Sequence, residues 1–214
     1  MALCAILGYL LHKKDVLTAL AFLLQFRTYV RPGVFDAITV SQLVPPVRAG
    51  IAPFSLWGLI LYPSEQGTPG KTGTFDDAVL LDSELWLDPF LRLLVANRLP
   101  QDLLFAQPGS SLVIKLQEAV LALGLAPLKP VRYSLRHGGA SDDLLCRRRS
   151  LEEVKKRGQW RTDQSLRRYG KETKALAEMY KIPSNILEYG LSVSENLANI
   201  FHQNIVAPPP SPLS

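Results

Sequence analysis

The sequence predicts an α+β domain that is mainly helical and has one small antiparallel β-sheet near its middle. Three observations predict it. Apolar residues recur at helical spacing in most segments, two short runs of strand-forming residues flank a glycine-rich connection, and 47% of the 214 residues are hydrophobic. This composition supports a sizeable core, and the length suits one domain with short tails.

The first part of the chain is apolar and helical in pattern. We expect residues 1–12 to form a helical remnant or linker that precedes the domain. Lysines follow this run instead of preceding it, which argues against a signal peptide, and no apolar run reaches the ~18–20 residues of a membrane span. Residues 16–30 predict a largely buried helix that ends at Pro32-Gly33, and residues 34–40 predict a shorter one.

The sheet is predicted from two apolar runs bounded by turn residues. Residues 53–63 (PFSLWGLILYP) and residues 76–82 (DDAVLLD) are rich in strand formers. Residues 64–74 (SEQGTPGKTGT) join them and contain three glycines. We therefore expect strand, exposed turn, strand.

The second half of the chain is predicted to be helical. Residues 85–98 and 110–123 carry apolar residues at helical spacing. Ser150-Leu-Glu-Glu153 is a capping box that begins a helix, and Gly158 ends that helix.

Three further features complete the expected organisation. Thr162 or Asp163 is expected to cap a helix that carries Tyr169. Residues 175–203 predict one or two terminal helices, and residues 206–214 a disordered proline-rich tail.

The positive charge is concentrated in one block. Between Val131 and Ala175 the chain has 13 of its 24 basic residues and only 6 of its 19 acidic residues, a balance of +7 in a chain whose total is +5. Such a focused basic block favours a polyanionic partner. A solvated helix face is the alternative that charge alone leaves open.

Cysteine and histidine usage gives no sign of a disulfide framework or a metal site. The chain has two cysteines, Cys4 and Cys146, and therefore no CxxC pair for zinc, and its three histidines are scattered. We expect no metal and no cofactor, and an intracellular, reducing compartment.

Five weak signals follow one another along the chain. Arg31 ends the buried helix, Lys71 lies in the exposed turn, a Tyr-x-x-Arg motif (Tyr133 to Arg136) precedes His137, and Trp160 stands nine residues before Tyr169. Each has a structural alternative. His137 could be a satisfied histidine of a surface helix, and the two aromatic residues could anchor the last helices to the core. Gly138-Gly139 suits a close approach of another backbone or of a ligand, or simply a turn.

The order and spacing of these signals resemble the catalytic domain of the tyrosine recombinases, or phage-type integrases, and more narrowly those of eukaryotic mobile elements. The resemblance covers roughly residues 13–180 and implies the tyrosine-recombinase catalytic-domain fold over residues 13–205. It also implies double-stranded DNA as partner, a dimer or tetramer on DNA, and the nucleus if the host is eukaryotic.

The resemblance implies a role for each residue. Arg31 and Arg136 would flank the scissile phosphate, because guanidinium groups match its non-bridging oxygens. Lys71 would protonate the leaving 5′-oxygen, Trp160 would contact the phosphate, and Tyr169 would form a 3′-phosphotyrosyl link without metal or ATP. His137 would support the site. The basic residues expected to contact DNA are Arg147, Arg148, Arg149, Lys155, Lys156, Arg161, Arg167 and Arg168.

The chain departs from the family pattern at three points. Val34 stands where an acidic residue usually braces the first arginine, and we expect Asp36 to substitute for it. Tyr133 replaces a histidine and, with a phenol pKa near 10, is a poorer general base. The family's N-terminal DNA-clamping domain is not seen in this sequence. Two alternatives therefore stay open, a catalytically inactive DNA-binding remnant of a mobile element and a type IB topoisomerase-like enzyme.

Overall fold

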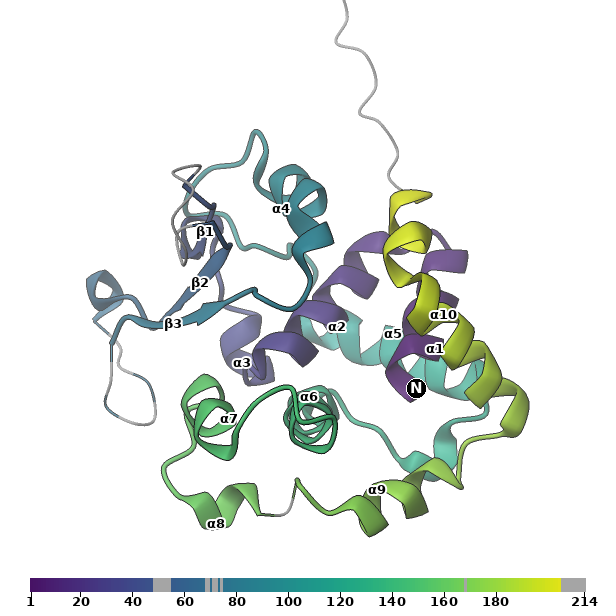
Figure 1. The fold of residues 1–214 in the computed structure, drawn as a ribbon. Helices are drawn as coiled ribbons and strands as arrows, with labels where there is room; N and C mark the ends of the chain where they lie inside the picture. Colours follow the sequence, from purple (N-terminus) through teal and green to yellow (C-terminus); the bar gives the residue numbers. More distant parts are fainter. Residues whose placement is uncertain (48–54, 68–69, 71–72, 74, 168, 205–214) are drawn as a thin grey trace, which may run out of the picture.

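The computed structural model describes residues 1–47, 55–67, 70, 73, 75–167 and 169–204, and its arrangement is mainly helical with a small sheet (Figure 1). The α-helices in this part are α1 (Ala2–His12), α2 (Val16–Thr28), α3 (Pro32–Phe35), α4 (Asp88–Val95), α5 (Gly109–Ala122), α6 (Tyr133–Leu145), α7 (Leu151–Arg157), α8 (Asp163–Leu166), α9 (Glu172–Met179) and α10 (Ser184–His202). Short 3-10 turns lie at Val40–Gln42, Ser64–Gln66, Leu85–Leu87 and Ala126–Leu128.

Helix α2 is the centre of the hydrophobic core. The side chain of Asp15 accepts a hydrogen bond from the Thr18 amide and caps its N-terminus. Leucines, alanines and Phe22 are buried on nearly every side of this helix, so the predicted buried helix is confirmed. It ends at Tyr29, which adopts the left-handed conformation with φ +55° and turns the chain toward Arg31.

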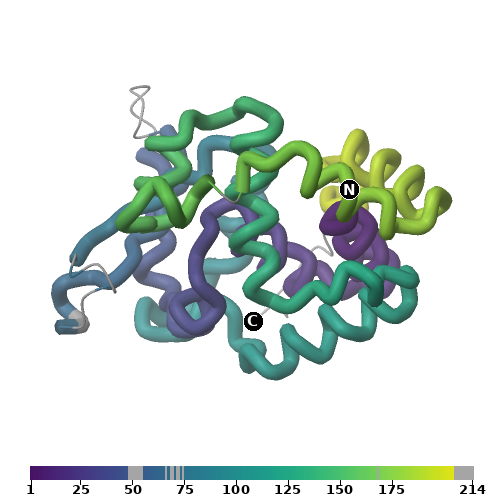
Figure 2. Tube along the Cα trace, turned by 90° about the horizontal axis from the view of Figure 1, so that it is seen from below, coloured from purple at the N-terminus to yellow at the C-terminus, as the bar shows by residue number. Residues whose placement is uncertain are grey.

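Helix α1 belongs to the same core. Ala5, Leu7 and Leu11 are fully buried, and the helix lies beside α10 in both views of the molecule (Figures 1 and 2). A Cβ on Gly190 of α10 would approach the Met1 carbonyl oxygen to 2.7 Å, which shows how closely the two helices meet. The first residues are therefore helical, as expected, and they pack into the domain instead of standing apart from it as a linker.

The sheet has three antiparallel strands in the order β1 (Leu43–Val44), β2 (Gly58–Leu61) and β3 (Asp77–Leu80). The β2–β3 pair is the predicted strand pair, although each strand is shorter than its apolar run. Strand β1 was not predicted, because two residues ahead of a proline pair carry no periodic signal. Residues 48–54 and much of the turn, including Lys71, lie outside the described residues.

Helix α6 crosses α2 at the glycine pair. A Cβ on Gly139 would overlap the backbone carbonyl oxygen of Phe26, and one on Gly138 would come within 3.0 Å of the Phe26 ring. The close approach expected at these glycines is therefore that of another backbone. Because Arg136 lies one turn before Gly139, this crossing brings it to the C-terminal end of α2.

The last third of the chain follows the predicted helices with one correction. The capping box at Ser150 and Glu153 is present, with both reciprocal hydrogen bonds, and α7 ends at Gly158 as expected. Helix α8, however, ends at Leu166, so the expected helix does not carry Tyr169. The predicted terminal helices are α9 and α10. Residues 205–214, which include the whole expected tail, lie outside the described part.

Candidate functional site

Side chains from four separate segments meet where α2, α6, α7 and α8 converge. The ring of Tyr133 lies 4.8 Å from that of His137, and His137 lies 5.0 Å from Tyr169 in a stacked arrangement. The Tyr169 ring is in turn 5.5 Å from that of Trp160. The structure thus brings together the Tyr-x-x-Arg motif, the tryptophan and the tyrosine that the sequence singled out.

Arg136 is at the centre of this cluster and is only 2% exposed. Its Nη1 donates to the backbone carbonyl of Tyr29, and its Nη2 donates to that of Gly158 at 2.6 Å. Its Nε is buried and meets no acceptor among the described residues. The guanidinium is therefore fixed by two carbonyl oxygens and still has donor capacity left.

Arg31 is the second cation of the cluster. Burial and the positive charge of Arg31 lower the pKa of Arg136 to about 10, while Tyr133, Tyr169 and Tyr62 oppose the shift. Arg136 is still charged at neutral pH. Arg31 donates to the Tyr62 hydroxyl at 3.4 Å, and within the described residues neither arginine forms a salt bridge with a carboxylate. Two neighbouring cations without an acidic partner favour binding of an anion.

The arginines around the cluster are different, because each pairs with an acid. Arg27 contacts Glu84, and Arg157 lies 3.6 Å from Asp82. Arg132, one turn before Arg136, is buried and binds Asp36 at 2.5 Å. The expectation that Asp36 would brace Arg31 is therefore wrong. Asp36 lies two residues after Val34 and binds Arg132 of α6 instead.

The eight basic residues expected to contact DNA divide into two sets. Arg148 and Arg149 are paired with acids, both through Asp143, and Lys155 pairs with Asp163 at 2.6 Å. Their ion pairs make these three the weaker candidates for DNA contact. Arg147, Lys156, Arg161 and Arg167 are exposed, as is Arg148 in spite of its ion pairs, and Arg168 lies outside the described residues.

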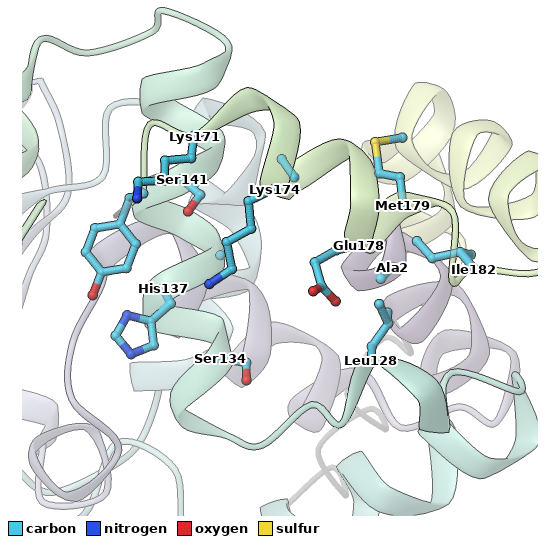
Figure 3. A pocket seen from close by; sticks show the side chains of 13 residues that line it. Ala2, Leu128, Ser134, His137, Ser141, Lys171, Lys174, Glu178, Met179 and Ile182 are labelled. Carbon is cyan, nitrogen blue, oxygen red and sulfur yellow. The ribbon is translucent and has the colours of Figure 1, made fainter. Parts of the chain in front are cut away.

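Tyr169 is 6% exposed and lines a cavity of about 600 Å³. Figure 3 shows His137, Ser134 and Ser141 on α6 facing Lys174 and Glu178 on α9 across this cavity. Leu128, Met179, Ile182 and Ala2 form its apolar end (Figure 3). The cavity is therefore polar near the candidate nucleophile and apolar away from it.

Lys171 and Lys174 are wall residues that sequence reasoning missed. Glu178, the acid of this wall, accepts from Lys181 at 2.8 Å with both carboxylate oxygens, and neither Lys171 nor Lys174 forms a salt bridge with the described residues. Their position two and five residues after Tyr169 in the basic block was the available signal. They add positive charge beside the tyrosine.

Two aromatic residues were also missed, and so was the contact that one glycine makes in the site. Tyr62, at the end of β2, directs its hydroxyl to Arg31, and Tyr29 supplies a carbonyl to Arg136. A Cβ on Gly158 would overlap the indole ring of Trp160, so only glycine fits there. No periodic or motif signal marks Tyr29 and Tyr62, because their roles arise from contacts between distant segments, and Gly158 was expected only to end α7.

The described residues contain no group of three or more His, Cys, Asp or Glu side chains placed to hold a metal ion. Nor does any helix among them have both the length and the apolar character needed to cross a membrane. No family model, no curated protein and no solved structure matches this chain.

Proposed function

We propose that this protein cleaves and rejoins a DNA strand through a covalent 3′-phosphotyrosyl intermediate, in site-specific recombination or integration of a mobile element. One observation carries the proposal: Arg31, Arg136, Trp160 and Tyr169 lie together. The two arginines have no carboxylate partner in the described residues. A phosphodiester supplies the anion that these cations lack. Its non-bridging oxygens gain charge in the transition state, where fixed donors are most effective.

The proposed step balances without a cofactor. The Tyr169 oxygen attacks phosphorus and forms a new P–O bond, its proton passes to solvent, and the bond to the 5′-oxygen breaks. The 5′-oxygen takes up a proton, which the family resemblance assigns to Lys71, a residue outside the described part of the structure. Rejoining reverses the step, so the phosphodiester energy is retained and no ATP is needed.

A second function, DNA binding without cleavage, is favoured by the burial of the site. Tyr169 is only 6% exposed, and Arg136 already donates to two backbone carbonyls. If the protein cleaves DNA, Tyr169 and Arg136 become exposed when DNA binds, and the strand reaches Tyr169 through the cavity beside it. If the protein only binds DNA, Tyr169 and Arg136 serve solely to stabilise the fold.

A suicide substrate separates the two functions. Duplex DNA nicked close to the cleavage site loses the short 5′-hydroxyl fragment, so the covalent intermediate accumulates and is seen as a protein–DNA band on a denaturing gel. Because the target site is unknown, a pool of nicked duplexes is used. We expect an adduct with the unmodified protein and none with Tyr169→Phe, which keeps the ring and removes the nucleophilic oxygen.

Peptide mapping of the adduct tests the choice of tyrosine. Tyr180, which is 82% exposed, and Tyr189 on α10 are the other tyrosines of the C-terminal region. DNA attached to either would show that the proposed nucleophile is wrong. Binding of the pool without any adduct would favour the second function.

A further inference from the structure

Tyr29 connects the candidate phosphate site to a buried ionic cluster on its other side. It follows the last residue of α2, is 1% exposed, and adopts the left-handed conformation that residues other than glycine rarely adopt. Such a conformation persists only where the surroundings hold it. The side chain of Tyr29 makes a contact that stabilises this conformation, and its backbone carbonyl contacts a residue of the candidate site.

The hydroxyl of Tyr29 donates a hydrogen bond to the Oδ2 atom of Asp143 on α6. Asp143 is 5% exposed and accepts two more hydrogen bonds at 2.9 Å, from the Nε atoms of Arg148 and Arg149. Arg149 in turn contacts Asp82 after β3. The phenol is thus anchored on a carboxylate that two arginines hold in place.

The backbone and ring of Tyr29 face the candidate site. Its carbonyl accepts from the Nη1 atom of Arg136, because the last carbonyls of a helix have no partner within the helix. Its ring centroid lies 6.2 Å from that of Trp160. Tyr29 therefore contacts Arg136 and Trp160, two of the groups that the proposed function assigns to the phosphate, and its own hydroxyl lies on the far side.

We infer that Tyr29 is a positioning residue for strand cleavage. Its hydrogen bond to Asp143 fixes the left-handed turn, and the carbonyl of that turn orients the Arg136 guanidinium toward the phosphate. This inference rests on the proposed function. It assigns Tyr29 no contact with DNA, so its loss affects the rate of cleavage and not the affinity for DNA.

Tyr29→Phe tests the inference, because it keeps the ring and deletes only the hydroxyl. The rate of adduct formation is measured at saturating protein and at a temperature where circular dichroism shows that both proteins are folded. We expect a rate at least about 10-fold lower than that of the unmodified protein, the loss produced by misplacing a catalytic group slightly. The dissociation constant for uncleavable DNA should stay within about twofold.

A second substrate distinguishes positioning of Arg136 from a merely structural role. A methylphosphonate at the cleaved linkage replaces one charged non-bridging oxygen by a neutral methyl group, so less arginine charge is needed. The defect of Tyr29→Phe should therefore shrink on this substrate, as that of Arg136→Ala should. Equal defects on both substrates would overturn the inference.

Tyr9→Phe is the matched control. The Tyr9 hydroxyl also donates to a carboxylate, Glu118 at 3.3 Å, but it lies on α1 outside the cluster. Its removal should leave the rate unchanged, and a defect equal to that of Tyr29→Phe would overturn the inference. If Tyr29→Phe does not fold, Asp143→Asn replaces it, with the same expected loss and the same substrate comparison.

The outcomes separate the inference from the function on which it rests. No adduct with the unmodified protein overturns the proposed function and the inference with it. An adduct that forms equally fast with Tyr29→Phe overturns the inference alone.

Discussion

The guanidinium carbon of Arg136 lies 4.1 Å from the ring centroid of Trp160, within the range of a cation–π contact. Gly158 leaves room for the indole ring, and its carbonyl oxygen accepts a hydrogen bond from the same arginine. Trp160 therefore orients Arg136 as well as lying beside Tyr169. Trp160 therefore has a specific role within the basic run, which is to contact the Arg136 guanidinium.

Trp160→Ala should slow adduct formation, because Arg136 loses the face that orients it. A cation–π contact contributes about 1–2 kcal/mol where it is desolvated, which corresponds to roughly a 10-fold lower rate. Trp160→Phe keeps an aromatic face and should retain most of the rate. Single-turnover measurements on nicked DNA check both variants, and equal rates for alanine and phenylalanine would exclude an aromatic role.

Gly139→Ala should destabilise the domain by several kcal/mol, because its new methyl group would overlap the Phe26 carbonyl and force α6 away from α2. Urea unfolding followed by circular dichroism measures the change. Gly33→Ala is the control. Nothing lies within 4 Å of a Cβ at Gly33, so this variant should be neutral or more stable by up to about 1 kcal/mol. Equal stability of the two variants would show that the helices do not meet closely at Gly139.

The stabilising effect of Asp143 should be lost in acid. Burial alone would raise the pKa of Asp143, but the hydrogen bonds from Tyr29 and Arg148 and the charges of Arg148 and Arg149 lower it below its ordinary value. A lowered folded-state pKa gives stability that is present above the unfolded value of about 3.9 and is lost as the pH falls through the folded value.

Comparing Asp143→Asn with the unmodified protein at several pH values measures this effect. The variant should be less stable at pH 7 by about 3 kcal/mol, the low end for removing one partner of a buried pair. The difference should shrink as the pH falls below about 4. Asp142, whose carboxylate is 37% exposed, provides the control, and Asp142→Asn should lower the free energy of unfolding by at most about 1 kcal/mol. A difference for Asp143→Asn that is constant with pH would contradict the lowered pKa.

Lys156 and Arg167 should contribute to DNA affinity in a way that depends on salt. Both are exposed and form no salt bridge with the described residues, so each is available to release counterions from a phosphate. Replacing each by glutamine should reduce the slope of log affinity against log salt by roughly 0.9 per lost contact. Fluorescence anisotropy over a salt series measures the slope, and an unchanged slope would remove both residues from the DNA surface.

Arg148→Gln and Arg149→Gln should behave in the opposite way. Both arginines are paired with Asp143, and Arg149 is only 15% exposed, so their loss leaves a buried carboxylate with fewer partners. We expect lower thermal stability and an unchanged salt slope. A large change in slope with normal stability would restore both arginines to the DNA surface.

Features that depend on neighbours along the chain could be predicted from the sequence. The capping box at Ser150, the buried helix before Arg31 and the strand pair around the glycine-rich turn follow from local pattern and were all predicted. The close approach at Gly138-Gly139 was also indicated, because a costly residue pair inside a helix requires a reason, although the sequence did not say what approaches.

The pairing of charges could not be predicted from local pattern, because it depends on how distant segments fold together. Arg31, Arg132, Arg136, Arg148 and Arg149 look alike in the sequence. In the structure Asp36 binds Arg132, and Asp143 binds Arg148 and Arg149, whereas Arg31 and Arg136 have no carboxylate partner among the described residues. The physical reason is that an ion pair depends on distances of a few ångströms between segments far apart in sequence. Those distances are set by the crossing of α6 over α2 and by the turn at Tyr29.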